Sequence, residues 1–244
     1  MYKLKGKEYW VIMASINYVF KRSEKKYLLD VEQYREISKR IKAFMTADKY
    51  GLSTICNIYY DTESFELIRR SIDKPCYKEK LRVRSYGVPR ENDLVFVEIK
   101  KKYNGIVYKR RVSMVLSEAV DYLENRNRPK AENQIFREID YFINYYNPRP
   151  AVYLAYDRLA YYGNVDNNVR VTFDTNIRSR SYDLSLAAGD YGEKLLKEGQ
   201  YLMEIKIAGA MPMWMVEILS DMKLYPTTFS KYGNIYAKSI AAIS

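Results

Sequence analysis

Charged and apolar side chains alternate with a period of two residues in many segments of this sequence, and this pattern constrains the fold more than any other feature. Successive side chains of a β-strand point to opposite faces, so the period predicts strands with one charged and one apolar face. A single strand of this kind would ordinarily form the solvated side of a sheet. A long series of them indicates that the charged faces lie together. The predicted strands cover residues 18–26, 53–61, 78–86, 94–102, 151–160, 169–174 and 203–207, with a further strand carrying Lys109 and Arg111 after a turn at 104–105.

The charged faces of these strands are mostly cationic. In the segment 78–86, for example, Lys80, Arg82 and Arg84 alternate with Leu81 and Val83. Burial of that many cations without counter-charge would cost several kcal/mol each, so the space that they line must hold water and an anionic guest. About eight strands is the number at which a barrel closes around a narrow interior. We therefore expect an α+β fold, a closed eight-stranded antiparallel β-barrel that forms a tunnel, with flanking helices.

Four helices are predicted between the strands from apolar periodicity and capping residues. The first follows Asp30, an N-cap with Gln33 three residues later, and its apolar stripe ends at Phe44. The others cover residues 117–125, 131–146 and 212–222, and residues 178–199 are interpreted as a long excursion between strands. No repeat, low-complexity tract or Gly/Ser-rich linker divides the sequence. We therefore expect a single domain over residues 1–244, with a core of about 16–236.

The charge balance indicates an anionic partner. The chain has 41 basic and 30 acidic residues, a formal net charge of +11, which suits nucleic acid, an acidic membrane surface or a phosphorylated small molecule. It contains no histidine. This excludes His-ligated metals, Ser-His-Asp and Cys-His catalysis and a phosphohistidine intermediate. Any metal must be held by carboxylates, which suit Mg²⁺ or Mn²⁺.

The N-terminal residues and the cysteines are consistent with a cytoplasmic protein. No secretory signal peptide is recognised, and the apolar stretch at residues 10–20 is too short to span a bilayer. Cys56 and Cys76 lack CxxC spacing, and we expect both to be reduced and buried. Attachment to the inner face of a membrane through a separate membrane protein stays open, and the oligomeric state is not indicated.

Three glutamates occur on the cationic faces in the same local context. Glu24, Glu98 and Glu204 each precede, by two residues, a lysine on the same strand face. Carboxylates among phosphate-binding cations are consistent with a metal that bridges to phosphate oxygens. The alternative is that they only neutralise the lysines as ion-pair partners. One such pair would favour the ion-pair interpretation, whereas three in matching contexts make the metal at least as good an explanation.

The 26 tyrosines are interpreted as mainly structural. Tyr59, Tyr60, Tyr161 and Tyr162 stand where amphipathic rings can cover a barrel wall. Stacking of one or two tyrosines on a nucleobase stays open, and the sequence does not indicate which ones. Aromatic residues with basic charge also suit single-stranded nucleic acid. Because the sequence has no basic low-complexity arm, no RNP-like motif and no recognisable DNA-binding helix, we expect no nucleic-acid partner.

Seven short motifs occur in order between about residues 20 and 232. They are Glu24-Lys25-Lys26-Tyr27, Tyr59-Tyr60-Asp61, Lys80-Leu81-Arg82-Val83-Arg84-Ser85-Tyr86-Gly87, Val97-Glu98-Ile99-Lys100-Lys101, Arg170-Val171-Thr172-Phe173-Asp174, Met203-Glu204-Ile205-Lys206 and Ser230-Lys231-Tyr232. Each motif alone is weak, but the ordered series is specific. It resembles the VTC domain, the polyphosphate polymerase branch of the triphosphate tunnel metalloenzymes in the CYTH-like superfamily.

The resemblance implies an eight-stranded tunnel in which a divalent metal, Mn²⁺ or Mg²⁺, assists transfer of the ATP γ-phosphate to a growing polyphosphate chain. The implied ligands are ATP and polyphosphate or triphosphate. The positions that match the family's phosphate-binding residues are Lys26, Arg82, Arg84, Lys100, Lys109, Arg158, Arg170 and Lys231, with Tyr156 and Ser230 as accessory contacts. Glu204 matches the metal-binding carboxylate, and Glu98 and Glu24 are further metal candidates. We predict catalytic roles for Arg82, Arg84, Lys100, Arg158 and Arg170, and add Lys80, Arg111 and Lys206 to the phosphate-binding set.

Two positions depart from the family pattern. Arg22 occupies the first acidic position of the ExExK motif that is typical of the hydrolase branch, which disfavours activation of water. Thr228 stands three residues before Lys231, where polymerase members often have a lysine, so phosphate binding is better supported than polymerase activity. Three alternatives therefore stay open: a triphosphate hydrolase, a polyphosphate-binding module without turnover, and an RNA-binding protein.

Overall fold

The structure, a computed structural model, describes residues 23–104, 106–130, 133–166 and 168–241. Within them, ten strands form a single sheet in which all neighbours are antiparallel. The strands are β1 (Ser23–Leu29), β2 (Met45–Ala47), β3 (Ser53–Asp61), β4 (Tyr77–Tyr86), β5 (Leu94–Tyr103), β6 (Ile106–Val115), β7 (Arg149–Gly163), β8 (Arg170–Arg180), β9 (Glu193–Lys194) and β10 (Tyr201–Ile207). The helices are α1 (Val31–Ile41), α2 (Glu66–Ile72), α3 (Leu116–Asn125), α4 (Gln134–Tyr146), α5 (Met213–Asp221) and α6 (Lys231–Ala241).

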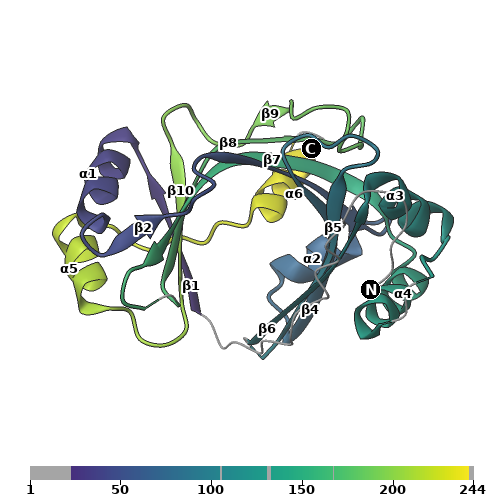
Figure 1. The fold of residues 1–244 in the computed structure, drawn as a ribbon, viewed down its shortest axis with the longest axis horizontal. Helices are drawn as coiled ribbons and strands as arrows, with labels where there is room; N and C mark the ends of the chain where they lie inside the picture. The colour runs from purple at the N-terminus through teal and green to yellow at the C-terminus, as the bar shows by residue number, and fades with distance from the viewer. Residues whose placement is uncertain (1–22, 105, 131–132, 167, 242–244) are drawn as a thin grey trace, which may run out of the picture.

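The sheet is an open arch, as Figure 1 shows, and not a barrel. Eight strands follow one another in the order β1-β10-β8-β7-β3-β4-β5-β6, while β2 pairs with β7 and β9 with β8. In the described part of the chain, no strand pairing joins the outer strands β1 and β6. The expected closed eight-stranded barrel is therefore wrong. Alternation assigns side chains to the two faces of a sheet, but closure also requires a strand stagger that lets the two edges meet.

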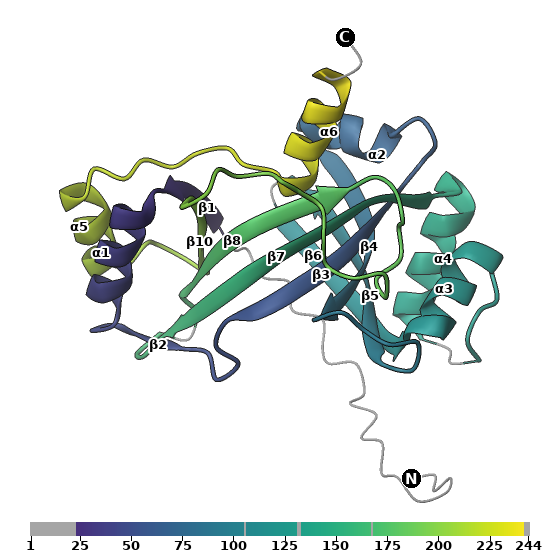
Figure 2. The same ribbon diagram turned by 90° about the horizontal axis from the view of Figure 1, so that it is seen from above.

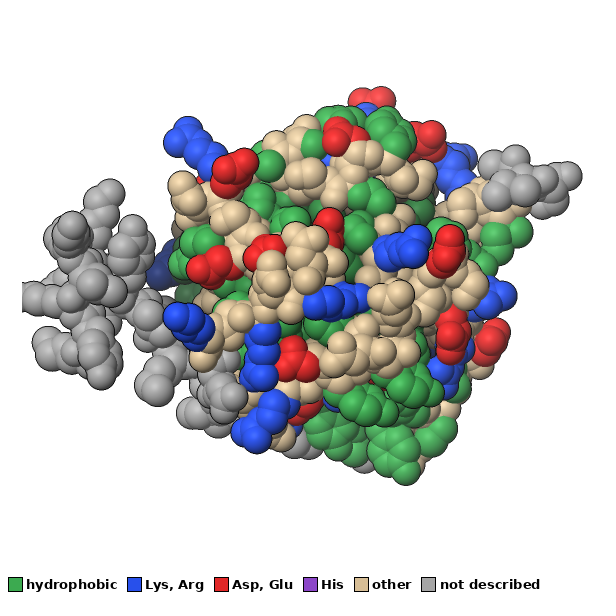
Figure 3. Space-filling view, turned by 90° about the vertical axis from the view of Figure 1, so that its right-hand side faces the viewer, with side chains coloured by type: hydrophobic (Ala, Val, Ile, Leu, Met, Phe, Trp, Pro, Cys, Tyr) green, Lys and Arg blue, Asp and Glu red, His purple; other side chains and the backbone are tan. Residues whose placement is uncertain are grey.

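The two largest apolar clusters lie on the outer face of the arch, one on each half, while a smaller cluster with Ile55, Leu154 and Leu202 lies on the inner face and packs against Phe229 and Ile235. Over β4 and β5, Leu81 and Val97 pack with Phe142 of α4. Over β8 and β10, Met203 packs with Ile37 of α1, in a cluster that also includes residues of α5. The apolar half of the alternating pattern therefore contacts helices, which leaves the charged half on the inner, concave face. Figure 3 shows the outer side over α3 and α4, where charged side chains of both signs are scattered among neutral and hydrophobic ones.

The predicted helices correspond to α1, α3, α4 and α5. Asp30 and Gln33 form the expected capping box at the start of α1, but this helix ends at Ile41, before Phe44. Residues 131–132, where the third predicted helix began, lie outside the described residues, as do Arg22 and the expected core start at residue 16. Helices α2 and α6 were not predicted. Part of the expected excursion at 178–199 is regular structure, because β8 extends to residue 180 and pairs with β9.

Neither cysteine is in a disulfide, as expected, but only Cys56 is buried. Cys76 is exposed, so its expected burial is wrong. It lies in the short connection between α2 and β4. The alternating pattern does not extend into this connection, so it could not predict whether Cys76 is buried. Among the described helices, none is both long and apolar enough to cross a membrane.

The buried carboxylate of Asp61 joins three elements at one end of the arch. It accepts hydrogen bonds from the backbone N–H groups of Leu67 (2.9 Å) and Ile68 (3.0 Å) at the start of α2. It also accepts one from the Tyr232 hydroxyl of α6, at 2.8 Å. Since α2 has no side-chain cap of its own, Asp61 satisfies its first donors. Figure 2 shows α2 and α6 side by side at this end, and the two helices are in contact.

We predict that Asp61→Ala lowers the free energy of unfolding by about 2–4 kcal/mol, because three buried donors lose their acceptor together. Tyr232→Phe removes only one of these bonds and should cost about 1 kcal/mol. Urea unfolding followed by circular dichroism measures both values. Equal stability of Asp61→Ala and the unchanged protein would contradict the role of this carboxylate.

Candidate functional site

The inner face of β4 carries a row of cations. Lys80, Arg82 and Arg84 point into the arch, while Leu81 and Val83 between them are buried in the outer core. Alternate side chains on a strand are about 7 Å apart, so neighbouring cations in this row repel each other by roughly 2 kcal/mol at an effective dielectric constant near 20. The row therefore requires counter-charges or an anionic ligand.

Glu98 of β5 supplies one counter-charge from a position that is only 1% exposed. Its carboxylate lies 2.7 Å from Nη2 of Arg82 and 2.7 Å from Nζ of Lys109, with Nε of Arg84 at 3.9 Å. Burial alone would raise the pKa of Glu98, but these three cations hold it well below its usual range. Glu98 is thus an ionised centre that holds two arginines and one lysine together.

Neutral side chains complete the orientation of the two arginines. Arg82 donates to the hydroxyl of Tyr59 at 2.9 Å. Arg84 donates to the side-chain oxygen of Asn57 at 2.8 Å and to the hydroxyl of Tyr156 at 3.0 Å. Burial raises the pKa of Tyr59, but the neighbouring cations outweigh this effect and lower it to about 8. Both guanidinium groups are therefore fixed before any ligand arrives.

Asp174 of β8 is the centre of a second cluster. Its fully buried carboxylate accepts two hydrogen bonds from Arg158, at 2.6 and 2.7 Å, and pairs with Lys231 at 2.6 Å. Lys231 also pairs with Glu204 at 2.9 Å. Burial lowers the pKa of Lys231, but the two carboxylates raise it above its ordinary value, so the amine stays protonated. Lys231, the first residue of α6, therefore connects this helix to β8 and β10.

Glu204 of β10 extends this cluster toward β1, the strand at one edge of the sheet. It lies 3.3 Å from Lys206 and 3.7 Å from Lys26, and Glu24 pairs with the same two lysines at 4.0 and 3.3 Å. Burial would raise the pKa of Glu204, but Lys231, Lys206 and other cations hold it well below its usual range. Two carboxylates and two lysines thus alternate in charge across β1 and β10.

Tyr156 connects the two clusters. Its hydroxyl accepts from Arg84 of the first cluster, and its ring contacts the cations of Arg158 (4.9 Å) and Lys231 (4.8 Å) from the second. Across the open side of the arch, the charge of Glu24 on β1 influences the pKa of Lys100 on β5. The two halves of the inner face therefore belong to one electrostatic unit.

Four of the inner-face cations predicted for the site have no carboxylate partner among the described residues. Arg170 and Lys100 are exposed and form no ion pair there, Lys80 lies over the ring of Tyr232, and Arg111 lies over the ring of Phe96. Burial and nearby lysines lower the pKa of Lys80 to about 8. The pKa of Lys100 is lowered too, chiefly because protein groups around the amine desolvate it and in part because the charge of Arg82 is near. The residue as a whole is still exposed to water. An anion placed among these groups would relieve their repulsion.

The predicted site residues therefore come together. All of the strand cations that were predicted for the site lie on the inner face, and Ser230 and Lys231 lie at the start of α6, where Ser230 accepts a hydrogen bond from the backbone N–H of Gly233. Sequence reasoning assigned no role to Asp174 or Asn57, and it gave Tyr59 only a structural role in the wall. Asp174 could have been found, because it is a carboxylate at an otherwise cationic position of an alternating strand. The pairing of Asn57 and Tyr59 with arginines depends on β3 lying next to β4, which local sequence does not specify.

The carboxylates differ in how well they suit a metal ion. No cluster of three or more acidic or cysteine side chains able to hold a metal occurs in the described part. Glu24 and Glu204 nevertheless lie close enough that each charge affects the other, and the buried hydroxyl of Thr172, opposite Glu204, has no hydrogen-bond partner. One or two carboxylates, with phosphate oxygens and water, are a usual ligand set for Mg²⁺. The second carboxylate and the unpartnered hydroxyl beside Glu204 make Glu24 and Glu204 a better fit for a divalent ion than Glu98. Glu204, like Glu98, is itself paired with cations: Lys26, Arg158, Lys206 and Lys231 lie 2.9–3.7 Å from it.

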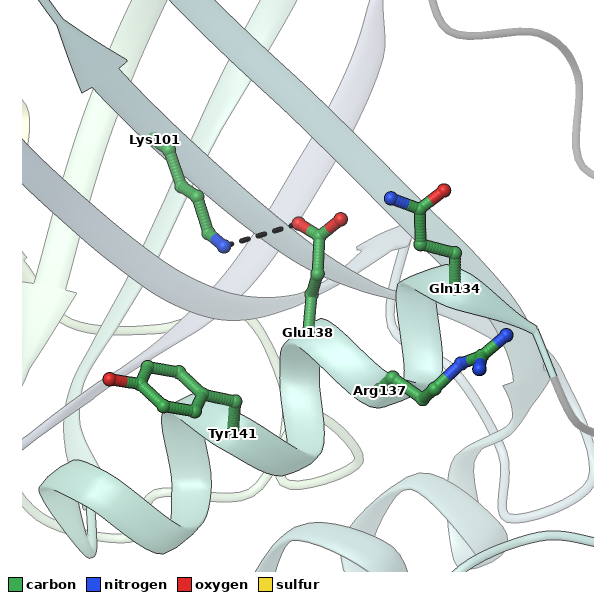
Figure 4. Close-up of a pocket in the computed structure, with 5 residues that line it drawn as sticks. All are labelled: Lys101, Gln134, Arg137, Glu138 and Tyr141. Carbon is green, nitrogen blue, oxygen red and sulfur yellow. Dashed lines mark ion pairs between the residues drawn. The ribbon is translucent and has the colours of Figure 1, made fainter.

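A pocket of about 480 Å³ lies elsewhere, on the outer face between β5 and α4. Figure 4 shows Lys101 paired with Glu138 there, beside Arg137 and Tyr141. Lys101 alternates with Lys100 and so points away from the inner face. This pocket shares no residue with the cationic clusters.

The comparisons with known proteins identify relatives of the chain. The VTC domain profile matches residues 21–240. The Trypanosoma brucei brucei protein named vacuolar transporter chaperone complex subunit 4 is 25% identical over 211 residues, which are 74% of this chain and 26% of that protein. Its Trypanosoma cruzi namesake is 24% identical over 213 residues, 73% of this chain and 26% of the relative. The chain thus spans about a quarter of the length of these relatives.

Solved structures share the fold at low sequence identity. A Bacillus halodurans protein described as an adenylate cyclase candidate has a TM-score of 0.53 and 15% identity, over 86% of this chain and 95% of its own. A Hippeastrum adenylyl cyclase candidate with a dominant triphosphatase activity has a TM-score of 0.53 and 14% identity, over 88% and 95% of the two chains. At these identities the likeness concerns the fold alone.

We predict that Glu98→Gln lowers the free energy of unfolding by about 3 kcal/mol at pH 7, because Arg82 and Lys109 lose their buried counter-charge. A carboxyl group with a lowered pKa in the folded state stabilises the protein above its unfolded pKa, and this contribution is lost as the pH falls. The difference between the variant and the unchanged protein should therefore narrow below about pH 4. Urea unfolding at several pH values measures it.

Glu138→Gln is the matched control, because Glu138 also pairs with two cations, Lys101 and Arg110, but on the outer face and with more exposure. It should cost about 1 kcal/mol or less. A Glu98→Gln variant as stable as this control at pH 7 would show that Glu98 does not hold the cluster together.

Proposed function

This chain belongs to the VTC domain family, and on that basis we propose that it is a metal-dependent polyphosphate polymerase, which transfers the γ-phosphoryl group of ATP to a growing polyphosphate chain. The observation that carries the proposal is the inner face itself. Cations held rigidly by buried carboxylates stand beside cations that have no carboxylate partner among the described residues, and both kinds face the same space. Such a surface binds an extended polyanion.

The two kinds of cation have different tasks in this mechanism. Arg82, Arg84 and Arg158 are fixed by carboxylates and tyrosines, so they present donors without reorganisation when negative charge moves during transfer. Arg170, Lys100 and Lys80 are free to form charge-assisted hydrogen bonds to phosphate oxygens. Together they hold the triphosphate extended and bring its γ-phosphate to the acceptor.

Catalysis in this proposal is positioning and electrostatic stabilisation, without a covalent protein intermediate. The terminal phosphate of polyphosphate attacks the γ-phosphorus of ATP, the bond to the β-phosphate oxygen breaks, and ADP leaves with that electron pair. Lysines and arginines around the transferred group stabilise its charge. The absence of histidine is compatible with this route, because no protein nucleophile is required.

Glu204 and Glu24 are the residues that would hold Mn²⁺ or Mg²⁺. A bound divalent ion supplies charge neutralisation at phosphate oxygens and at the leaving diphosphate. Lys26 and Lys206 lie between the two carboxylates. These lysines keep both carboxyl groups ionised at neutral pH, so that they are ready to coordinate a cation.

We further infer a cytoplasmic location at a membrane, reached through a partner protein. The support is that the trypanosomal relatives are named as subunits of a vacuolar transporter chaperone complex. The chain spans only about a quarter of the length of those relatives. The partner protein is therefore proposed here together with the location.

Incubation of the protein with ATP and Mn²⁺, followed by gel separation of the phosphate products, tests the proposed function. Chains of increasing length with release of ADP are the expected result. Release of orthophosphate alone would identify a triphosphate hydrolase. Binding of tripolyphosphate without consumption of ATP would identify a binding module, and RNA binding that tripolyphosphate does not displace would identify an RNA-binding protein.

We predict that Arg170→Ala and Arg82→Ala each reduce polyphosphate synthesis at least a hundredfold, since each removes a charge-assisted contact to the reacting phosphates. Arg170→Ala is the cleaner test of the two. Arg170 is exposed and has no partner among the described residues, whereas Arg82 also holds Glu98 and Tyr59. Initial rates of ADP release measure the effect, and Arg170→Ala should leave the unfolding midpoint unchanged.

Arg137→Ala, an exposed arginine of the outer face, is the control and should keep full activity. Full activity in both Arg170→Ala and Arg82→Ala would rule out the inner face as the reaction site.

We predict that Glu204→Gln raises the Mn²⁺ concentration required for half-maximal activity at least tenfold, because one of two carboxylate ligands is lost. Isothermal titration with Mn²⁺ in the presence of a non-hydrolysable ATP analogue gives an independent readout of metal binding. An unchanged metal requirement, with an unchanged binding isotherm, would remove Glu204 from the metal site.

A further inference from the structure

The inner face carries aromatic rings, and most of them are already engaged. The Tyr59 ring stacks on Tyr232 at 5.0 Å, and the Tyr156 ring contacts the cations of Arg158 and Lys231. The hydroxyl groups of both tyrosines accept hydrogen bonds from arginines. These rings are therefore already in contact with protein groups and form the wall of the site.

Tyr86 and Phe96 are different. They are the last inner-face residue of β4 and the first inner-face ring of β5, and they meet edge to face, with centroids 5.9 Å apart and planes at 82°. Tyr86 is 58% exposed, although it points to the same side as the cations of its strand. The guanidinium of Arg111 lies over Phe96 at 4.5 Å, and it has no carboxylate partner in the described part. The three side chains form an aromatic corner with a free positive charge.

The aromatic corner lies at one end of the row of cations on β4. On β4, Tyr86 follows Arg84 at the next inner position, about 7 Å further along the strand. The opposite end of the arch is occupied by α2 and α6, which Asp61 joins to the end of β3. Because β3 and β4 are antiparallel and Tyr86 pairs with Ile55, the aromatic corner lies at the end away from these helices. A ligand whose phosphates reach the cations of β4 would leave its non-phosphate part here.

We infer that the corner of Tyr86, Phe96 and Arg111 is a stacking site for the base of a nucleoside triphosphate. This inference rests on the proposed function and adds the orientation of the nucleotide. The base lies against the rings at the open end, the ribose spans the step from Tyr86 to Arg84, and the phosphates continue along the cations toward Lys80. Stacking on aromatic rings uses the flat face that every base has, so ATP and GTP should bind with similar affinity.

Tyr162 is the competing candidate on the inner face. It is 39% exposed and lies opposite Arg170 in the pairing of β7 with β8. However, its ring is in contact with no other ring and no cation of the described residues. Tyr86 and Phe96 together offer two surfaces and a cation, and we therefore place the base there.

The test compares the affinities for ATP and for inorganic tripolyphosphate, measured by isothermal titration in the absence of turnover. The variants are Tyr86→Ala and Phe96→Leu, and the second keeps the apolar volume but removes the ring. Each should weaken ATP binding about fivefold or more, as expected for the loss of base stacking, and leave tripolyphosphate binding unchanged. Tyr141→Ala, a tyrosine of similar exposure (64%) on the outer face, is the control and should change neither.

Each outcome has a distinct meaning. Equal weakening of ATP and tripolyphosphate, or no weakening of ATP, would overturn the stacking site. Weakening of ATP by Tyr162→Ala alone would move the base to β7 and would equally overturn it. If the unchanged protein binds neither ligand, the proposed function itself fails. If it binds both with equal affinity, the phosphate site stands and the base has no site of its own.

Discussion

Repulsion among cations crowded onto one concave face is the constraint on which the rest of this structure depends. Adjacent cations on a strand repel by roughly 2 kcal/mol, and several strands contribute such rows. A few deeply buried carboxylates offset this repulsion, and Glu98 and Asp174 each pair with two or more cations. Because carboxylates are fewer than cations, part of the repulsion remains for a ligand to relieve. The site is thus built to be completed by an anion.

The rest of the fold keeps this charged surface accessible and rigid. The two largest hydrophobic clusters lie outside the arch, under α1 and α5 on one half and under α3 and α4 on the other. Most apolar packing therefore stabilises the sheet from outside, and on the inner face it is confined to the part that Phe229 and α6 cover. Asp61 fixes α6 at one end through Tyr232, which places Lys231 between two carboxylates of neighbouring strands. Apolar stabilisation thus comes mainly from the outer face of these strands, and the groups proposed to bind the ligand lie on their inner face.

The two ends of the inner face differ from each other. One end is occupied by α2 and α6, and the other carries the rings of Tyr86 and Phe96 beside Arg111, which has no carboxylate partner in the described residues. In the proposed reaction, a nucleotide has a base at one end and a reactive phosphate at the other, so a site with two unlike ends can select one orientation. Fixed arginines near the middle then act on the phosphates, while free lysines and arginines adjust to the length of the chain.

The sequence by itself determined which side chains share a face, because a strand has a period of two whatever surrounds it. From that rule came the cationic inner face, most strand positions and the capped start of α1 at Asp30. Tertiary structure alone decided that the sheet stays open between β1 and β6, that Asn57 and Tyr59 hold arginines, and that α6 brings Lys231 to Asp174. These features depend on strand stagger and on contacts between residues far apart in the chain, and local periodicity carries no information about either.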